Sequence, residues 1–321
     1  MFSFVRQFGS MFLASTQEGT GGQGGSSGFT SQAWESDPRW GREHWRIRSE
    51  PIRWPNNQRV ATVCAISFGL PDLIFPVPQG GGYTGTVARV HVQMYGPRQG
   101  VWRLLDLLDA HGVKASFEVN GICAARFPTA VQEIDRRGHE IVPQYWANNV
   151  FHDQQSVQQD RELIRRTLST IADVTGKRAS GWVAPELRLG ERTLAILAEE
   201  EITWHACSLS DDLPYSIGVG GRKMVVLPHS IPQMEDLGIV IGNRRSPDVF
   251  VEFLKQEFTA LYREGAKTPK MFNFSLHAEF GGKPFFATAI EEALSYQESY
   301  SDVWFTTRQQ VADWWTRQGY G

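Results

Sequence analysis

The chain has 321 residues, of which 41% are hydrophobic and 21% charged, so it can bury one large core or two ordinary ones. Its 32 basic and 35 acidic side chains give a formal net charge of −3, which argues against nucleic-acid binding through a broadly basic surface. The cysteines, Cys64, Cys123 and Cys207, show no C-x-x-C spacing. We therefore expect neither a disulfide framework nor a cysteine zinc site, and a cytoplasmic, reducing location fits best.

The first 58 residues differ in composition from the rest of the chain. Residues 15–30 are rich in Gly, Ser, Thr and Gln, so we expect 1–33 to be a flexible segment. Residues 34–58 hold Trp34, Trp40, Trp45 and Trp54, and we expect a Trp-rich arm that wraps the domain or a neighbouring subunit rather than one that stacks on a ligand. A single compact domain is expected over residues 59–321.

From residue 60, short apolar runs alternate with amphipathic helical stretches, which is the pattern of βα units around a parallel sheet. Strands are predicted at 61–68, 114–119, 139–142, 180–184, 203–208, 224–227, 271–276 and 302–306. A first helix is predicted from 101 to a stop at 112 and a second between the strand 114–119 and residue 137, and further helices are predicted over 156–174, 191–200 and 246–265. Seven or eight mostly parallel strands favour an α/β fold that is a closed or nearly closed (β/α) barrel. No Gly-x-Gly-x-x-Gly or P-loop follows a predicted strand, so we expect no nucleotide cofactor.

In such a barrel, functional side chains follow the strands at their carboxyl ends. Glu118 and Asn120 share one strand face, and a carboxylate in an apolar strand is either satisfied structurally or has a raised pKa that suits proton transfer. His277 ends the apolar run 271–276, a position that favours a functional imidazole. The other loops that follow strands present Gln144, Trp146, Asn148, Glu186, Arg188, Asp211, Asp212, His229, Glu235 and Asp236. The Asp211-Asp212 pair fits a turn at least as well as catalysis.

Several blocks occur in a fixed order along the chain: 95–103 (YGPRQGVWR), 138–141 (GHEI), 181–182 (GW), 211–215 (DDLPY), 265–271, 276–277 (LH) and 302–304 (DVW). In these blocks the sequence resembles the polysaccharide deacetylase (NodB-homology, carbohydrate esterase family 4) superfamily, and most closely its PuuE-type allantoinase and cyclic-imide hydrolase branch. The resemblance covers about residues 55–317. It implies a distorted NodB-like (β/α) barrel, a homo-oligomer and a small substrate of the cyclic amide type, whereas wider relatives deacetylate sugars.

The departures from this family fall on its chemistry. The first motif of the family has two aspartates after Thr/Ser-Phe, whereas this chain reads Ser67-Phe68-Gly69-Leu70. The metal histidines of the family fall on Gln144 and Asn148, and neutral amides do not replace an Asp/His₂ zinc site. The third-motif arginine falls on Glu186, and of these catalytic positions only His277, the usual general acid, is retained. We therefore expect no metal.

We hypothesise a metal-independent hydrolase of a C–N (amide) bond in a small cyclic ureide, imide or lactam. Glu118 or Glu186 would act as general base and His277 as general acid. The substrate would be bound by Asn120, Gln144, Trp146, Asn148, Arg188, Asp211 and His229. The expected partner is a small molecule, neither nucleic acid nor membrane, and a dimer or tetramer is expected.

Two alternatives stay open at this point. The same barrel with an acid–base pair could serve as a lyase, decarboxylase, isomerase or cyclase of a secondary-metabolite pathway, because one barrel hosts many chemistries. The chain could also be a catalytically inactive binding protein, which the retention of His277 disfavours.

Overall fold

The computed structural model describes residues 51–320 except for 75–85, 232–233 and 239–244. The chain divides into two units, Met1–Pro51 and Ile52–Gly321, and the second is described below. The expectations for the flexible segment 1–33 and for most of the Trp-rich arm lie outside the described residues. No helix in the described part of the chain is long and apolar enough to cross a membrane.

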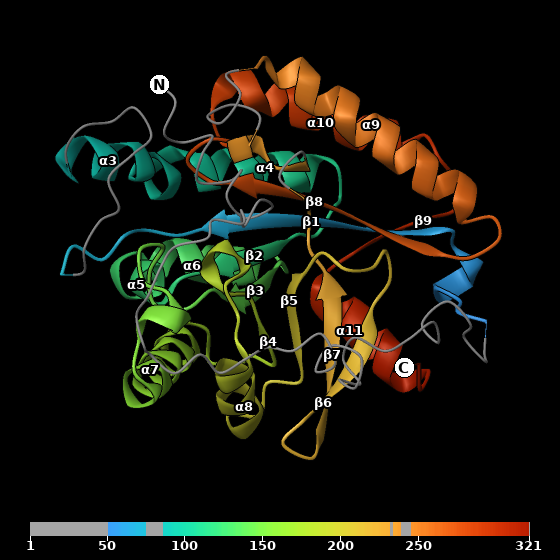
Figure 1. The fold of residues 1–321 in the computed structure, drawn as a ribbon. Helices are drawn as coiled ribbons and strands as arrows, with labels where there is room; N and C mark the ends of the chain where they lie inside the picture. Colours follow the sequence, from blue (N-terminus) through green and yellow to red (C-terminus); the bar gives the residue numbers. More distant parts are fainter. Residues whose placement is uncertain (1–50, 75–85, 232–233, 239–244, 321) are drawn as a thin grey trace, which may run out of the picture. The chain divides into compact units, whose positions relative to one another are not determined.

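The first sheet has β1 (Val60–Phe68) at its centre (Figure 1). Along one edge, β1 pairs with β8 (Lys270–His277). The other edge is shared, because β2 (Ser116–Val119) pairs with the carboxyl-terminal part of β1 and β9 (Val303–Thr306) with its amino-terminal part. β3 (Glu140–Pro143) lies beside β2. All these pairings are parallel, so the strands end toward the same side of the sheet.

The second sheet has the order β4 (Gly181–Trp182), β5 (Trp204–Ser208), β7 (Arg222–Pro228) and β6 (Tyr215–Val219). β6 pairs antiparallel with β7 through a two-residue turn, Gly220-Gly221, in which both residues have positive φ, 58° and 77°. Glycine adopts this region without a steric penalty, and such turns match the twist of a hairpin. The sequence analysis did not predict β6.

Backbone contacts link the first sheet to the second sheet and its loops. The Val183 amide donates to the Pro143 carbonyl at 3.0 Å, which links the strand ends of β3 and β4. On the other side, a parallel bridge connects Glu235 with Ser275 of β8. The predicted α/β architecture with mostly parallel strands is confirmed, with the strands of the described residues arranged as two connected sheets.

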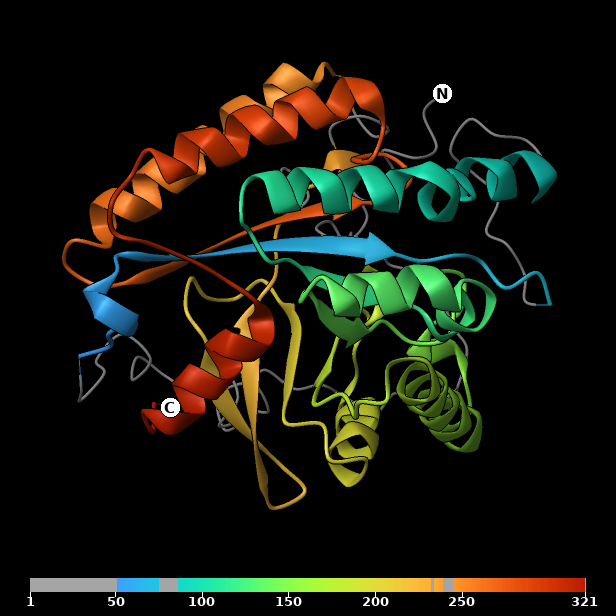
Figure 2. The same cartoon turned by 180° about the vertical axis from the view of Figure 1, so that it is seen from behind.

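Helices cover the outer faces of the sheets. α4 (Val101–Ala110), α9 (Pro247–Glu264) and α10 (Pro284–Glu298) run along the outer side of β1 and β8, and Figure 2 shows them from behind. The helix predicted up to residue 137 is two helices that meet at Phe127-Pro128, because proline starts a helix well but cannot continue one. The sequence analysis did not predict α3, α10 or α11. The bounds are α3 (Thr86–Gln93), α4 (Val101–Ala110), α5 (Gly121–Arg126), α6 (Pro128–Arg136), α7 (Val157–Thr175), α8 (Glu191–Glu199), α9 (Pro247–Glu264), α10 (Pro284–Glu298) and α11 (Arg308–Arg317).

Alternation along β1 separates two apolar clusters. Cys64 and Ile66 belong to the larger cluster, which packs the sheet against the helices, whereas Ala61 and Val63 belong to the smaller one between the two sheets. Trp54 closes the smaller cluster, since its ring packs on tryptophans of β9 and α11 and its Nε1 donates to the Lys270 carbonyl at 2.8 Å. The compact unit therefore begins before the expected residue 59 and includes the last tryptophan of the predicted arm.

Candidate active site

Polar side chains replace apolar ones on the interior side of the first sheet where its strands end. Ser67 of β1 is in register with Glu118 of β2 on one side and with His277 of β8 on the other. Residues in register on neighbouring parallel strands point to the same face. These three side chains therefore form one layer at the carboxyl edge, where functional groups of such folds gather.

Glu118 is buried, with only 3% of its surface exposed, and three donors surround its carboxylate. Oε2 accepts from Gln144 Nε2 at 3.0 Å, and Oε1 accepts from the Arg308 guanidinium and faces His229 Nε2 at 3.2 Å. Burial alone would raise the pKa of Glu118, but Arg308, helped by His229, lowers it to about 2.

The pKa of Glu118 is therefore shifted in the opposite direction to the one expected from its sequence environment. The expectation of a raised pKa fails because the apolar strand gave no indication of the counter-ion, Arg308, which begins α11 and is completely buried. A carboxylate with this pKa is a poor proton acceptor at neutral pH. Its contacts suit it to hold Gln144 and His229 in place.

His277 forms an ion pair with a buried carboxylate. Its Nδ1 lies 2.7 Å from Asp236 Oδ1, and its backbone amide donates to Asp236 Oδ2 at 2.8 Å. Burial lowers the pKa of His277, but the Asp236 carboxylate overcomes this and raises it to about 10. The imidazole is therefore protonated at neutral pH, and Nε2, which has no hydrogen-bond partner within the described residues, is the ring nitrogen left to act as a proton donor.

A second histidine lies between two carboxylates. His229 follows β7, and besides Glu118 at Nε2 it has the Ser230 carbonyl 3.1 Å from Nδ1 and Glu235 Oε1 3.8 Å from Nδ1. Ser230 is fixed in turn, since its hydroxyl lies 2.5 Å from that of Ser275. His229 thus lies between the predicted residue Glu118 and Glu235, a residue for which no role was predicted from the sequence.

Amide groups occupy the region of the lost family aspartate and metal ligands. Gln144 Oε1 accepts from the Ser67 hydroxyl at 3.1 Å, so both ends of this amide are engaged. A Cβ at Gly69 would lie 2.3 Å from Asn148 Oδ1 and 2.4 Å from Asn120 Oδ1. A side chain at position 69 would therefore collide with the two asparagine amides, which explains why glycine stands in place of an aspartate.

This donor set does not fit the metal of the wider family. Gln144 is neutral and committed to Ser67 and Glu118, and Asn148 offers one more neutral amide. Within the described ranges, no group of three or more His, Cys, Asp or Glu side chains could hold a metal ion. We therefore derive no catalytic step through a metal.

The residue after Gln144 is strained and firmly anchored. Tyr145 has φ of 59°, a region that non-glycine residues seldom adopt and that is tolerated where surrounding contacts enforce it. Its hydroxyl donates to the buried Asp160 at 2.9 Å, and the same carboxylate accepts from His152 Nδ1 at 2.6 Å and Thr193 Oγ1 at 3.0 Å. This network fixes the backbone that presents Gln144.

Two predicted substrate-binding residues are structural instead. Asn120 is fully buried, with Oδ1 accepting from the Leu70 amide and Nδ2 donating to the Gln144 carbonyl, both at 2.8 Å. Trp146 is 3% exposed, and its Nε1 donates to Asp72 at 2.8 Å. The structure therefore corrects the expectation that the ring of Trp146 holds a ligand at the rim, because packing and this hydrogen bond occupy it.

Three other predicted residues make surface or turn contacts. Glu186, the second candidate base, has 64% of its side chain exposed and pairs at 3.7 Å with Arg188. Arg188 pairs with Asp153 on the surface. Asp211 Oδ1 accepts from the Leu213 amide at 3.0 Å, which fits the turn interpretation. These contacts involve residues outside the cluster, and the roles expected for Glu186, Arg188 and Asp211 stay predictions.

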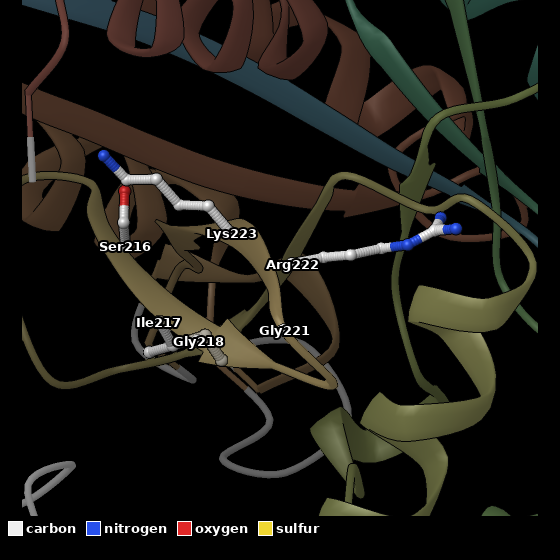
Figure 3. Close-up of a pocket in the computed structure, with 6 residues that line it drawn as sticks. All are labelled: Ser216, Ile217, Gly218, Gly221, Arg222 and Lys223. Carbon is white, nitrogen blue, oxygen red and sulfur yellow. The ribbon is translucent and has the colours of Figure 1, made fainter.

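A shallow hollow at the β6–β7 hairpin, shown in Figure 3, has different chemistry. It is lined by Ser216, Ile217, Gly218, Gly221, Arg222 and Lys223. Arg222 begins β7, whereas His229 follows the other end of the same strand, so the hollow and the polar cluster belong to opposite ends of β7. The hollow contains no histidine or carboxylate, and we place the site at the cluster.

Residues 95–204 match the polysaccharide deacetylase family, and the chain contains a polysaccharide deacetylase domain of the NodB-homology type. The structure is similar to that of PuuE allantoinase, with a TM-score of 0.75 and 27% identity over 84% of this chain and 95% of that one. It is also similar to a probable polysaccharide deacetylase from Pseudomonas aeruginosa PAO1, with a TM-score of 0.76 and 25% identity over 87% and 98% of the two chains.

Among curated proteins, a putative polysaccharide deacetylase of Schizosaccharomyces pombe is 22% identical over 240 residues, which cover 69% of this chain and 74% of the relative. Deacetylases and allantoinase are hydrolases of C–N bonds other than peptide bonds, and the domain places the chain in this class of enzymes. The predicted family and NodB-like fold are confirmed.

Proposed function

We propose that this chain hydrolyses a C–N bond of a small cyclic amide, such as a ureide, an imide or a lactam, with side chains in place of a metal ion. The observation that carries the proposal is the ion pair of His277 with the buried Asp236. His277 is in register with Ser67, whose hydroxyl donates to Gln144, at a position where the family has a metal ligand. The likeness to PuuE allantoinase supports a cyclic ureide or a related ring.

In the proposed reaction, His277 donates a proton from Nε2 to the ring nitrogen as the C–N bond breaks, which turns a poor leaving group into a neutral amine or amide. The Asn148 amide hydrogen-bonds the substrate, and the oxygen of Ser67, whose hydroxyl donates to Gln144, accepts from a ring N–H. A donor that is already oriented, here the Asn148 amide, stabilises the charge that develops on the carbonyl oxygen without reorganising.

The alternative of a non-hydrolytic acid–base enzyme also has an observation in its favour, because both motif-one aspartates are absent from Ser67-Phe68-Gly69-Leu70. Mass spectrometry separates the two functions. The purified chain is incubated with allantoin, hydantoin, dihydrouracil, succinimide, glutarimide and a lactam series, with and without a zinc chelator. We expect a product heavier by one water that forms equally well with chelator present. A product of unchanged or lower mass would favour the alternative, and full loss with chelator would refute the metal-independent chemistry.

Removal of the proton donor provides the matching residue test. His277→Ala is expected to lower turnover by the ~10²–10⁴ typical of a lost acid or base. Arg136→Ala, at an exposed position on α6 where the side chain pairs with Glu133, serves as the control. Unchanged turnover in His277→Ala would remove the central residue from the mechanism.

A further inference from the structure

Two adjacent carboxylates on the segment that joins the sheets serve different histidines. Asp236 is completely buried, and both its oxygens are used by His277. Glu235 points instead toward His229, with Oε1 3.8 Å from Nδ1, and accepts from the Ser230 hydroxyl at 3.4 Å. The bridge between Glu235 and Ser275 holds this segment on β8, two residues before His277.

The two glutamates that flank His229 differ in their availability for proton transfer. Glu118 is saturated by three close donors and is almost inaccessible. The side chain of Glu235 is 21% exposed, and its contacts are long, so an oxygen can turn to a bound water at little cost.

The charges around Glu235 also favour a proton acceptor. Burial has the largest effect and raises the pKa of Glu235; His229 and His277 lower it, and the smaller effects of the Glu118 and Asp236 charges raise it again. A carboxylate with a raised pKa accepts a proton far better than one held near 2, as Glu118 is.

We propose that Glu235 is the general base of the hydrolysis proposed above, on which this inference rests. A Glu235 carboxylate oxygen takes one proton from water, the water oxygen bonds to the amide carbon, and the carbonyl electron pair moves to oxygen. When this intermediate collapses, the C–N bond breaks and His277 gives its Nε2 proton to the departing nitrogen. Glu235 then holds the proton taken from water, and His277 lacks the one given to the nitrogen; transfer of a proton from Glu235 to His277 through solvent restores both. The sum is one water added across the C–N bond.

The test compares Glu235→Gln, Glu235→Ala and Glu279→Gln for kcat and KM across pH on whichever cyclic amide the wild type hydrolyses. Glu279 is the matched control, because burial raises its pKa to about 7 and it follows His277 by two residues. We expect Glu235→Gln to lower kcat by ~10²–10⁴ with little change in KM, and to remove the acidic limb of the pH profile. Glu279→Gln should keep that limb.

Chemical rescue distinguishes a base from a positioning residue. Added formate should restore part of the turnover of Glu235→Ala and none of that of His277→Ala, since only the first lacks a carboxylate. Full kcat in Glu235→Gln, an unchanged acidic limb, or no rescue by formate in a folded Glu235→Ala would overturn the assignment. No turnover by the wild type on any cyclic amide would instead refute the proposed function, and the base assignment with it.

Discussion

The buried pair of Glu118 and Arg308 gives the most quantitative prediction. Glu118→Gln keeps the shape of the side chain and an oxygen that can accept from Gln144, but leaves the guanidinium without a counter-charge inside the fold. Breaking a buried pair by removing one partner costs about 3–5 kcal/mol of folding free energy. The pKa of Glu118 gives a similar figure, because a shift from 4.5 to about 2 corresponds to roughly 3 kcal/mol.

The assay is urea unfolding of the wild type, Glu118→Gln and the double variant Glu118→Gln/Arg308→Met between pH 2 and 8. Because the folded-state pKa is depressed, the stabilisation from Glu118 is complete above pH 4.5 and is lost as pH falls toward 2. The single variant should lose stability at pH 7 and show a flatter pH dependence in this window. The double variant should regain much of the loss, since no unpaired charge remains. A loss below about 1 kcal/mol in Glu118→Gln, with an unchanged slope below pH 4.5, would refute this account.

Three more predictions concern groups that surround the site or support it. Asp236→Asn removes the charge that raises the pKa of His277 to about 10, so the alkaline limb of the kcat/KM profile should move toward 6.5; a limb that stays in place would contradict the ion-pair argument. Burial lowers the pKa of His205 to about 4, so stability should be lost as pH falls from 6.5 through 4, and His205→Gln should show a smaller loss in urea unfolding over that range. Asp160→Ala leaves three buried donors unsatisfied, the Tyr145 hydroxyl among them, and should lower the free energy of unfolding by at least roughly 2 kcal/mol; wild-type stability would show that the network is dispensable.

The sequence predicted the elements whose pattern is local. Apolar runs predicted β1 and β8 within one residue of their observed ends. α7 was also predicted closely, because Ser156 caps it and Gly176, with φ of 70°, ends it. β6 was missed although Tyr215, Ile217 and Val219 alternate with Ser216 and Gly218, a pattern from which this partly exposed strand could have been predicted.

The candidate site could be predicted only in part. His277 was identified from its place at the end of an apolar run, and Glu118 from the cost of burying a carboxylate. The charged partners of these two residues were not identified, because Arg308 is 190 residues from Glu118 in the sequence and Asp236 is 41 residues from His277. Pairings over such separations depend on how the strands are arranged, which no local pattern in one sequence encodes.

The shared edge of β1 has a consequence for the order in which the protein can be completed. β9 pairs with the amino-terminal part of β1 and leads directly into α11, which begins with Arg308. The Arg308 guanidinium that neutralises Glu118 is therefore synthesised long after β2, the strand that carries Glu118. In a nascent or truncated chain that lacks this last segment, the buried carboxylate of Glu118 would have no guanidinium to neutralise it. Assembly of the reaction centre thus depends on translation reaching the final βα unit, and nonsense mutations there should abolish function even though the residues that meet substrate are all present.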